Sequence, residues 1–494
     1  MMHILAINAV PDYGVLGLIV VSLLGVGFMI WFLMALIAEE KQTRRKQVSV
    51  LYFRSGAPGH RDPSSSPNGR DNVRGEATCR IRSDVGRTSI AAPRAHVLRL
   101  SDKKSQKTVK LRWLIMALVL STTVRSSAQN TSQPTPPATP LATPAIIGPL
   151  QAAPPIMIDA GPLGKLDLDG VVSGLGLWQG NHVAGDNATQ AALSNAQVFI
   201  QKTNGWWQFY VQAGAYDIPA LGTAFLSTDK TITDLWGPVP AAYLKLLPGK
   251  NTSILVGALP TLMGAESTFD FQNMNIERGL LWNQENSVNR GIQVNQTMGK
   301  FSASISWNDG YYSNRYSWLS GSLTYAKGPH SVEFTAMGNL GQTVRQTLAT
   351  PVQNNGSMYA LIYTYTKGNW IVQPYYQYGS VPTNARVGVV RGASTNGGAI
   401  LVSRSFKHGF SLAGRGEYIG SSGNAAEQDV NLLYGPGSAA WSATLTPTFQ
   451  YQRFFVRGDF SFVRAADITR GDAFGSDGGN QDQPRGIGEV GLLF

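Results

Sequence analysis

Residues 301–309 read "FSASISWND" and place every second side chain on the same face of an extended chain. Phe301, Ala303, Ile305 and Trp307 fall on one face, while serine and asparagine occupy the other. A repeat of two residues is the period of a β-strand that has one apolar and one polar side. The stretch therefore predicts a strand that separates an apolar medium from a polar one.

The same alternation recurs along the C-terminal two thirds of the chain. Each segment runs about ten residues, which is the length that a tilted strand needs to cross a bilayer core. We predict sixteen strands, at residues 166–179, 192–203, 206–216, 238–248, 251–260, 289–298, 301–309, 316–326, 330–339, 358–367, 369–378, 397–406, 409–420, 438–450, 453–463 and 485–494.

The connections between these segments decide the fold class. Tight turns such as "MGK" and "TKGN" alternate with longer polar loops. This alternation is typical of an all-β, transmembrane, up-and-down antiparallel β-barrel, here of about 16 strands (14 to 18). An even number of strands returns the C-terminus to the periplasmic side, where the first strand begins.

The last nine residues, "GIGEVGLLF", predict the closing strand. Val490, Leu492 and Phe494 would face lipid, and Glu489 would face the lumen. This strand must pair with the first one, because an open edge in hydrocarbon leaves backbone groups without hydrogen bonds. Its terminal aromatic residue resembles the C-terminal signal of bacterial outer-membrane barrels, which implies the barrel-assembly machinery as a partner.

The positive charge of the chain is confined to its first part. Residues 1–128 contain 19 Lys and Arg against 8 Asp and Glu, which accounts for the whole net charge of +11. Residues 129–494 contain 22 of each type, so we expect no nucleic-acid partner. The single cysteine, Cys79, also lies in the first part, and the remainder can form no disulfide.

The region before the barrel divides into three segments. Residues 1–110 form a leader extension with a candidate transmembrane helix at 15–38 and a basic low-complexity stretch. Residues 111–128 contain the h- and c-regions of a signal peptide, and residues 129–160 form a Pro/Thr-rich linker before the barrel at 161–494. The extension is either an upstream segment from a misassigned start, which we favour, or a true membrane anchor before an internal export signal.

Tryptophan and tyrosine gather near both ends of the predicted strands, as they do at membrane interfaces. We expect two girdles of these aromatic residues. One lies by the short turns, at Trp206, Trp207, Tyr325, Trp370 and Tyr451, and the other lies toward the long loops, at Trp178, Trp307, Tyr311, Tyr312, Trp318, Tyr376 and Tyr378.

Two stretches carry a family resemblance. They are "NAQVFIQKTNGWWQFYVQAGAY" at 195–216 and residues 241–296, which contain a Gly-x-Glu element at Gly264 to Glu266. The chain resembles the β-barrel porin-2 (OmpL-like) family. The resemblance implies a channel-forming barrel in the outer-membrane lipid of a Gram-negative-type bacterium. Because sixteen strands normally leave an aqueous channel, we expect a passive porin for small hydrophilic solutes or ions.

The longest connection, residues 261–288, is the candidate constriction loop. By analogy, sixteen-stranded general porins fold their third long loop into the lumen, where opposed charges set ion preference. The alternative is a solvated external loop. The loop contains Glu266, Asp270, Glu277, Arg278 and Glu285, and the candidate lumen wall contains Lys245, Arg415, Glu417, Arg457 and Asp459.

Two other classes of function compete with the porin. An outer-membrane enzyme is disfavoured because the mature region contains only His182, His330 and His408, none beside a nucleophile partner, so we expect no catalytic site, metal or cofactor. A structural or adhesive barrel would have its lumen plugged by side chains such as Phe199 and Tyr375. A homotrimer is an expectation from analogy with sixteen-stranded porins.

Overall fold

The computed structural model describes residues 141–146, 148–344 and 346–494. The candidate helix at 15–38, the signal peptide at 111–128 and the linker up to residue 140 lie outside this range. No helix within the range is long and apolar enough to span a membrane.

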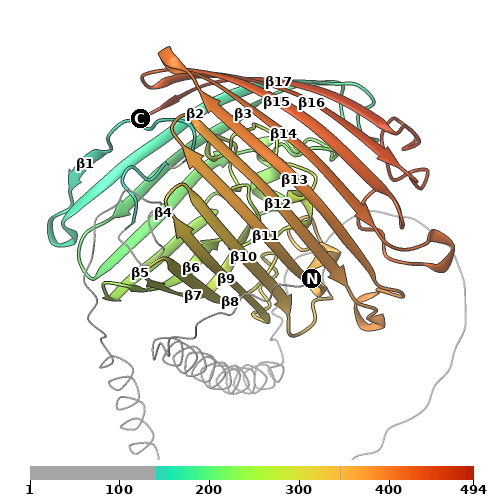
Figure 1. Ribbon diagram of the computed structural model, residues 1–494, viewed down its shortest axis with the longest axis horizontal. Coiled ribbons are helices and arrows are strands. Elements are labelled where there is room, and N and C mark those ends of the chain that lie inside the picture. Colours follow the sequence, from blue (N-terminus) through green and yellow to red (C-terminus); the bar gives the residue numbers. More distant parts are fainter. Residues whose placement is uncertain (1–140, 147, 345) are drawn as a thin grey trace, which may run out of the picture. The chain divides into compact units, whose positions relative to one another are not determined.

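Sixteen antiparallel strands, β2 to β17, form one closed barrel. Each strand pairs with the next in the chain, and β17 pairs back with β2 (Figure 1). The predicted fold class and strand number are therefore confirmed. The strands are β2 (Lys165–Gln179), β3 (Thr189–Lys202), β4 (Trp207–Tyr216), β5 (Ala241–Gly249), β6 (Thr252–Pro260), β7 (Val288–Met298), β8 (Phe301–Asn308), β9 (Trp318–Lys327), β10 (His330–Asn339), β11 (Ser357–Lys367), β12 (Trp370–Val381), β13 (Ala393–Ser405), β14 (Phe410–Ser421), β15 (Ala439–Tyr451), β16 (Phe454–Ala466) and β17 (Asp482–Leu493).

The two faces of the barrel differ in polarity as the alternation predicts. On β16, Phe460 is 62% exposed, whereas its neighbour Asp459 is fully buried. On β11, Leu361 points outward, and on β17 Val490 does so as well, each about half exposed. A continuous apolar outer surface of this size is stable in lipid, because exposing the same apolar area to water would be unfavourable in free energy.

The seam of the barrel is closed by its last residue. The Phe494 N–H donates to the Gly170 carbonyl at 2.9 Å, and the Gly170 N–H donates to the Phe494 carbonyl at 2.7 Å. Any Cβ at position 170 would lie 2.2 Å from the Phe494 ring, so the ring packs directly over this glycine. Beyond the end of β17, the short strand β1 (Ile156–Asp159) pairs with the start of β2 and satisfies the rest of that edge.

Short turns and long loops occupy opposite ends of the barrel. The turns at 250–251, 299–300, 328–329 and 368–369 are two residues long, whereas the loops include 217–240, 261–287 and 422–438. The loop at 217–240 contains the one α-helix of the described residues, α3 (Thr228–Asp234). The 3-10 helices are η1 (Gly161–Leu163), η2 (Asp270–Gln272), η3 (Trp282–Gln284), η4 (Val352–Asn355), η5 (Ala385–Val387), η6 (Lys407–Gly409) and η7 (Ala425–Glu427).

The expected aromatic girdles are only partly correct. Trp206, Trp370 and Tyr376 are exposed on the outer surface. Trp318 is fully buried and Tyr311 is 6% exposed, so assigning these two to the outer girdle was wrong. Trp318 pairs with Asn308 on the lumen side of the barrel, and its ring packs edge-on against Tyr311 at 5.6 Å between centroids.

Candidate functional site

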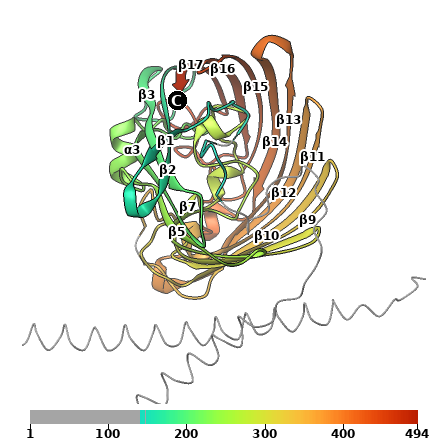
Figure 2. The same ribbon diagram turned by 90° about the vertical axis from the view of Figure 1, so that its left-hand side faces the viewer.

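The loop at residues 261–287, between β6 and β7, lies inside the ring of strands (Figure 2). Its apolar side chains are buried against lumen-facing residues: Phe271 contacts Phe199 of β3, and Leu281 belongs to a cluster with Leu401 of β13. Burial of these side chains supplies the main favourable term for holding a loop in this position. We call residues 261–287 the inner loop.

Glu266 joins the inner loop to strand β14. Its Oε1 lies 2.5 Å from Nη1 of Arg415, and the same nitrogen donates to the carbonyl of Glu277 at 2.7 Å. Glu417, two residues along β14, accepts hydrogen bonds from the backbone N–H of Leu280 at 3.1 Å and from the Ser442 hydroxyl at 2.7 Å. Charge-assisted bonds of this kind are about twice as strong as neutral ones.

Glu277 joins the inner loop to the last two strands. Its Oε1 accepts from Nη1 of Arg485 on β17 at 2.7 Å, and its Oε2 accepts from the Ser461 hydroxyl on β16 at 2.6 Å. Asp459 of β16 accepts from the backbone N–H of Ile276 at 2.8 Å. Carboxylates on the wall therefore satisfy loop amides, which would otherwise be buried without partners.

Asp270 and Arg457 fix the start of the inner loop. Asp270 Oδ1 accepts from the Asn195 side chain of β3 at 2.8 Å. Arg457 of β16 donates to the carbonyls of Asp270 at 3.0 Å and Asn273 at 2.9 Å. It also lies 3.6 Å from Glu489 of β17. The structure thus brings four of the five predicted wall residues into contact with the loop.

The other loop charges and the fifth wall residue are also buried. Glu285 accepts from the Gln377 side chain of β12 at 2.6 Å, and its burial, with Glu266 nearby, raises the pKa of this carboxyl well above its usual value. The backbone of Arg278 forms a short parallel bridge with Ala220, and burial lowers the pKa of its guanidinium. Lys245 is buried on β5, in register with Gln208 of β4.

A second segment covers the lumen wall from the end with the short turns. The Leu141 N–H donates to Gln208 Oε1 at 3.0 Å, the Ala145 N–H donates to Asp169 Oδ2 at 2.9 Å, and Gln151 and Gln450 exchange two hydrogen bonds. Ala145, Ile146 and Leu150 are buried in the cluster that contains Phe271. The sequence predicts residues 141–160 as part of a linker, but the structure places residues 141–146 and 148–151 against the wall. We call these residues the inner strap.

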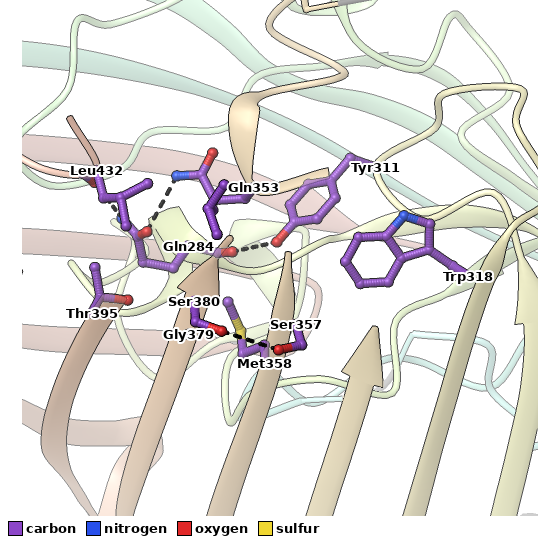
Figure 3. A pocket seen from close by; sticks show the side chains of 11 residues that line it. Gln284, Tyr311, Trp318, Gln353, Ser357, Met358, Gly379, Ser380, Thr395 and Leu432 are labelled. Atoms are coloured by element: carbon purple, nitrogen blue, oxygen red, sulfur yellow. Dashed lines mark hydrogen bonds between the residues drawn. The ribbon is translucent and has the colours of Figure 1, made fainter. Parts of the chain in front are cut away.

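At the end with the long loops, the inner loop packs against side chains of β9, β10 and β11 and of the loop before β9. Met263, Tyr311, Trp318, Met337 and Met358 pack into one buried apolar layer. Beside it lies a cavity of about 10 Å³, lined in part by Gln284 and Gln353 (Figure 3). That volume suits a single water molecule and no larger solute.

Sequence reasoning missed three participants in the site. Arg485 was not proposed, although it lies on the same face of the last strand as Glu489 and the period of two could have found it. Gln377 faces the lumen for the same reason. Asp217, in the loop after β4, left no signal in the sequence. It is fully buried near Asp270 and Arg278, and its burial raises the pKa of its carboxyl.

The predicted C-terminal signal residues lie at the seam. Val490 and Leu492 point outward, and Phe494 packs over Gly170. Both observations are those expected of a closing strand.

The closed barrel, its apolar outer surface and its inserted loop define an outer-membrane barrel of porin type. The chain belongs to the family described as "Putative beta-barrel porin-2, OmpL-like", whose model matches residues 165–494. It is accordingly a protein of the bacterial outer membrane.

Comparison with solved structures finds outer-membrane proteins of low sequence identity. The structure resembles OmpT of Vibrio cholerae (10% identity, TM-score 0.47, covering 69% of this chain and 100% of that chain). It also resembles the outer membrane channel DcaP of Acinetobacter baumannii (12% identity, TM-score 0.45, covering 67% and 97%) and Salmonella typhi OmpF in complex with daunomycin (14%, 0.44, covering 69% and 100%). No curated protein matches the chain in sequence.

Proposed function

We propose that this protein is a passive porin that lets small hydrophilic solutes or ions diffuse across the outer membrane. The single observation that carries the proposal is the closed sixteen-stranded barrel with a polar inner face, within a family of porins. Barrels of this size normally enclose an aqueous channel unless something fills it. Passive diffusion needs neither a catalytic residue nor a cofactor, and we propose no enzymatic activity.

The inner loop is proposed as the constriction of this porin. Support comes from its five charged side chains, Glu266, Asp270, Glu277, Arg278 and Glu285, all buried inside the barrel. The wall against which the loop packs carries Arg415, Glu417, Arg457 and Asp459. Because these charges pair with one another, the loop would narrow the lumen by occupying part of it, and the polar wall left uncovered would favour small polar molecules over apolar ones.

The route of export and assembly is proposed from the C-terminal strand and the signal peptide. The outward Val490, Leu492 and Phe494 are proposed as the signal read by the barrel-assembly machinery, after export directed by residues 111–128. A homotrimer is proposed by analogy. In support of that analogy, the Vibrio cholerae OmpT has been solved in a trimer form.

One observation favours a second candidate, a structural barrel with a filled lumen. Phe199, Tyr210 and Tyr375 face the lumen and are buried, and the inner loop and inner strap both cover the wall. A barrel filled in this way would be stable and inserted but would not conduct.

Ion conduction distinguishes the two candidates. The protein would be purified from outer membranes of an expressing bacterium and inserted into planar lipid bilayers. Stable ohmic current steps are expected for a porin. A heat-modifiable, correctly folded barrel that produces no steps would refute the porin and leave the filled barrel.

A further inference from the structure

One arc of the lumen wall, formed by β8 to β12, is less covered than the rest. In the half of these strands nearest the short turns, inward-facing side chains are partly exposed: Ser322, Thr324, Ser331, Glu333, Thr364 and Gln373. In contrast, nearly all inward-facing side chains of β13 to β17 and of β2 are buried. The inner loop and the inner strap account for this difference, because their contacts lie mainly on the second group of strands.

Hydroxyl and amide groups line the less covered arc. Within the described strands β8 to β12, Glu333 is the single charged side chain that faces the lumen. Its neighbours Val332 and Phe334 are 40% and 47% exposed on the outer surface, which fixes the inward direction of Glu333.

Glu333 differs from the carboxylates of the inner loop in the charge of the residues that face it. Its directly opposite residues are Thr324 on β9 and Ile362 on β11, both uncharged. Glu266 and Glu277 instead face Arg415 and Arg485 at 2.5 and 2.7 Å. A carboxylate with uncharged cross-strand neighbours keeps its attraction for passing cations, whereas a nearby arginine cancels most of that attraction.

We propose that solutes cross the barrel along the inward face of β8 to β12, here called the lane, and that Glu333 gives the lane a preference for cations. The proposal rests on the porin function proposed above. A single negative charge in a narrow, low-dielectric passage raises the local concentration of cations and lowers that of anions. The lane would therefore take small monovalent cations and uncharged hydroxylated solutes.

The narrow end of the lane is apolar. Beyond Glu333, the next inward residue of β10 is Thr335, whose hydroxyl lies 3.2 Å from the sulfur of Met263 on the inner loop. Met337 and Met358 complete this part of the buried layer. Because methionine side chains are flexible, this layer can open by rotamer changes, and Met263 sets the width of the lane.

Two properties measured on single channels test the proposal separately. The protein would be purified from outer membranes, and the reversal potential would be measured under a potassium chloride gradient. In Glu333→Gln, the cation-to-anion permeability ratio is expected to fall roughly 25-fold: about fivefold from the lost attraction of cations at about 4 Å in water, and about fivefold from the lost repulsion of anions. Glu333→Lys is expected to reverse the preference. Met263→Ala is expected to raise conductance and leave the ratio unchanged.

Glu427→Gln provides the matched control, because Glu427 lies exposed in the loop after β14 and pairs with Arg391. It is expected to leave the ratio unchanged. An unchanged ratio in Glu333→Gln, with normal current steps, would overturn the lane and preserve the porin. An equal shift in Glu427→Gln would also overturn it. A native protein that carries no current would overturn both proposals.

Discussion

Arg415 is the residue whose replacement should most disturb the inner loop. Its guanidinium contacts Glu266 at 2.5 Å and the carbonyl of Glu277 at 2.7 Å, and it is completely buried. Arg415→Gln removes the positive charge but leaves Glu266 and Glu417 in place. Removing one partner of a buried ion pair costs about 3–5 kcal/mol, because the remaining charge stays desolvated.

This cost translates into a change in loop occupancy. Since 1.4 kcal/mol is a factor of ten, the released state of the inner loop should gain roughly a hundredfold to a few thousandfold in relative population. We expect single-channel records of Arg415→Gln to show frequent transitions to a level of higher conductance. The temperature of the heat-induced gel shift should also fall.

Arg464→Gln is the matched control on the outer face of β16. Arg464 pairs with Asp482 at 2.8 Å, but its side chain is 46% exposed. Surface pairs of this kind contribute about 1 kcal/mol or less. If Arg415→Gln leaves both conductance and gel shift like those of the control, the buried network does not hold the loop.

Three further perturbations follow from the structure. Gly170→Ala should lower the yield of closed barrel, because its Cβ would meet the Phe494 ring. Gly176→Ala on the same strand places its Cβ in open space and should leave the yield unchanged. Gel mobility measures the yield of closed barrel. Burial raises the pKa of the Glu285 carboxyl. The contribution of its bound proton to the stability of the folded barrel is therefore complete below the unfolded pKa of about 4.3, and it is lost as pH rises through the folded pKa. The gel-shift temperature should therefore fall with rising pH more steeply than in Glu285→Gln. Deleting the inner strap should raise conductance, whereas deleting residues 130–140 should not, and equal conductances would contradict the covering role of the strap.

The strands could be predicted because their information is local. A period of two is visible within ten residues, and every predicted strand is present with ends that differ by four residues or fewer. The same period also indicates which residues face the lumen. It would have corrected Trp318, because Leu323 and Tyr325 of the same strand point outward and an even position must then point inward.

The position of the inner loop could not be predicted from its own residues. Four acids and one arginine suit a solvated external loop equally well. Its partners Arg415, Arg457 and Arg485 lie far along the chain, and only barrel closure brings them to the loop. The position of the inner strap could not be predicted for a similar reason. A proline-rich stretch is typical of a linker, and its contacts with the wall depend on strands far along the chain.

A disulfide between the inner loop and the wall provides the most direct test. The Asn275 side chain donates to the Thr446 hydroxyl of β15 at 2.7 Å, and Cys79 is the single cysteine of the chain. The measurement is the single-channel conductance of Asn275→Cys with Thr446→Cys, in a Cys79→Ser background, after oxidation. We predict that the disulfide forms and that ohmic steps persist, because solutes pass beside the fixed loop. Failure of the disulfide to form in a folded barrel, or a locked barrel that no longer conducts, would contradict a porin with its loop held in the lumen.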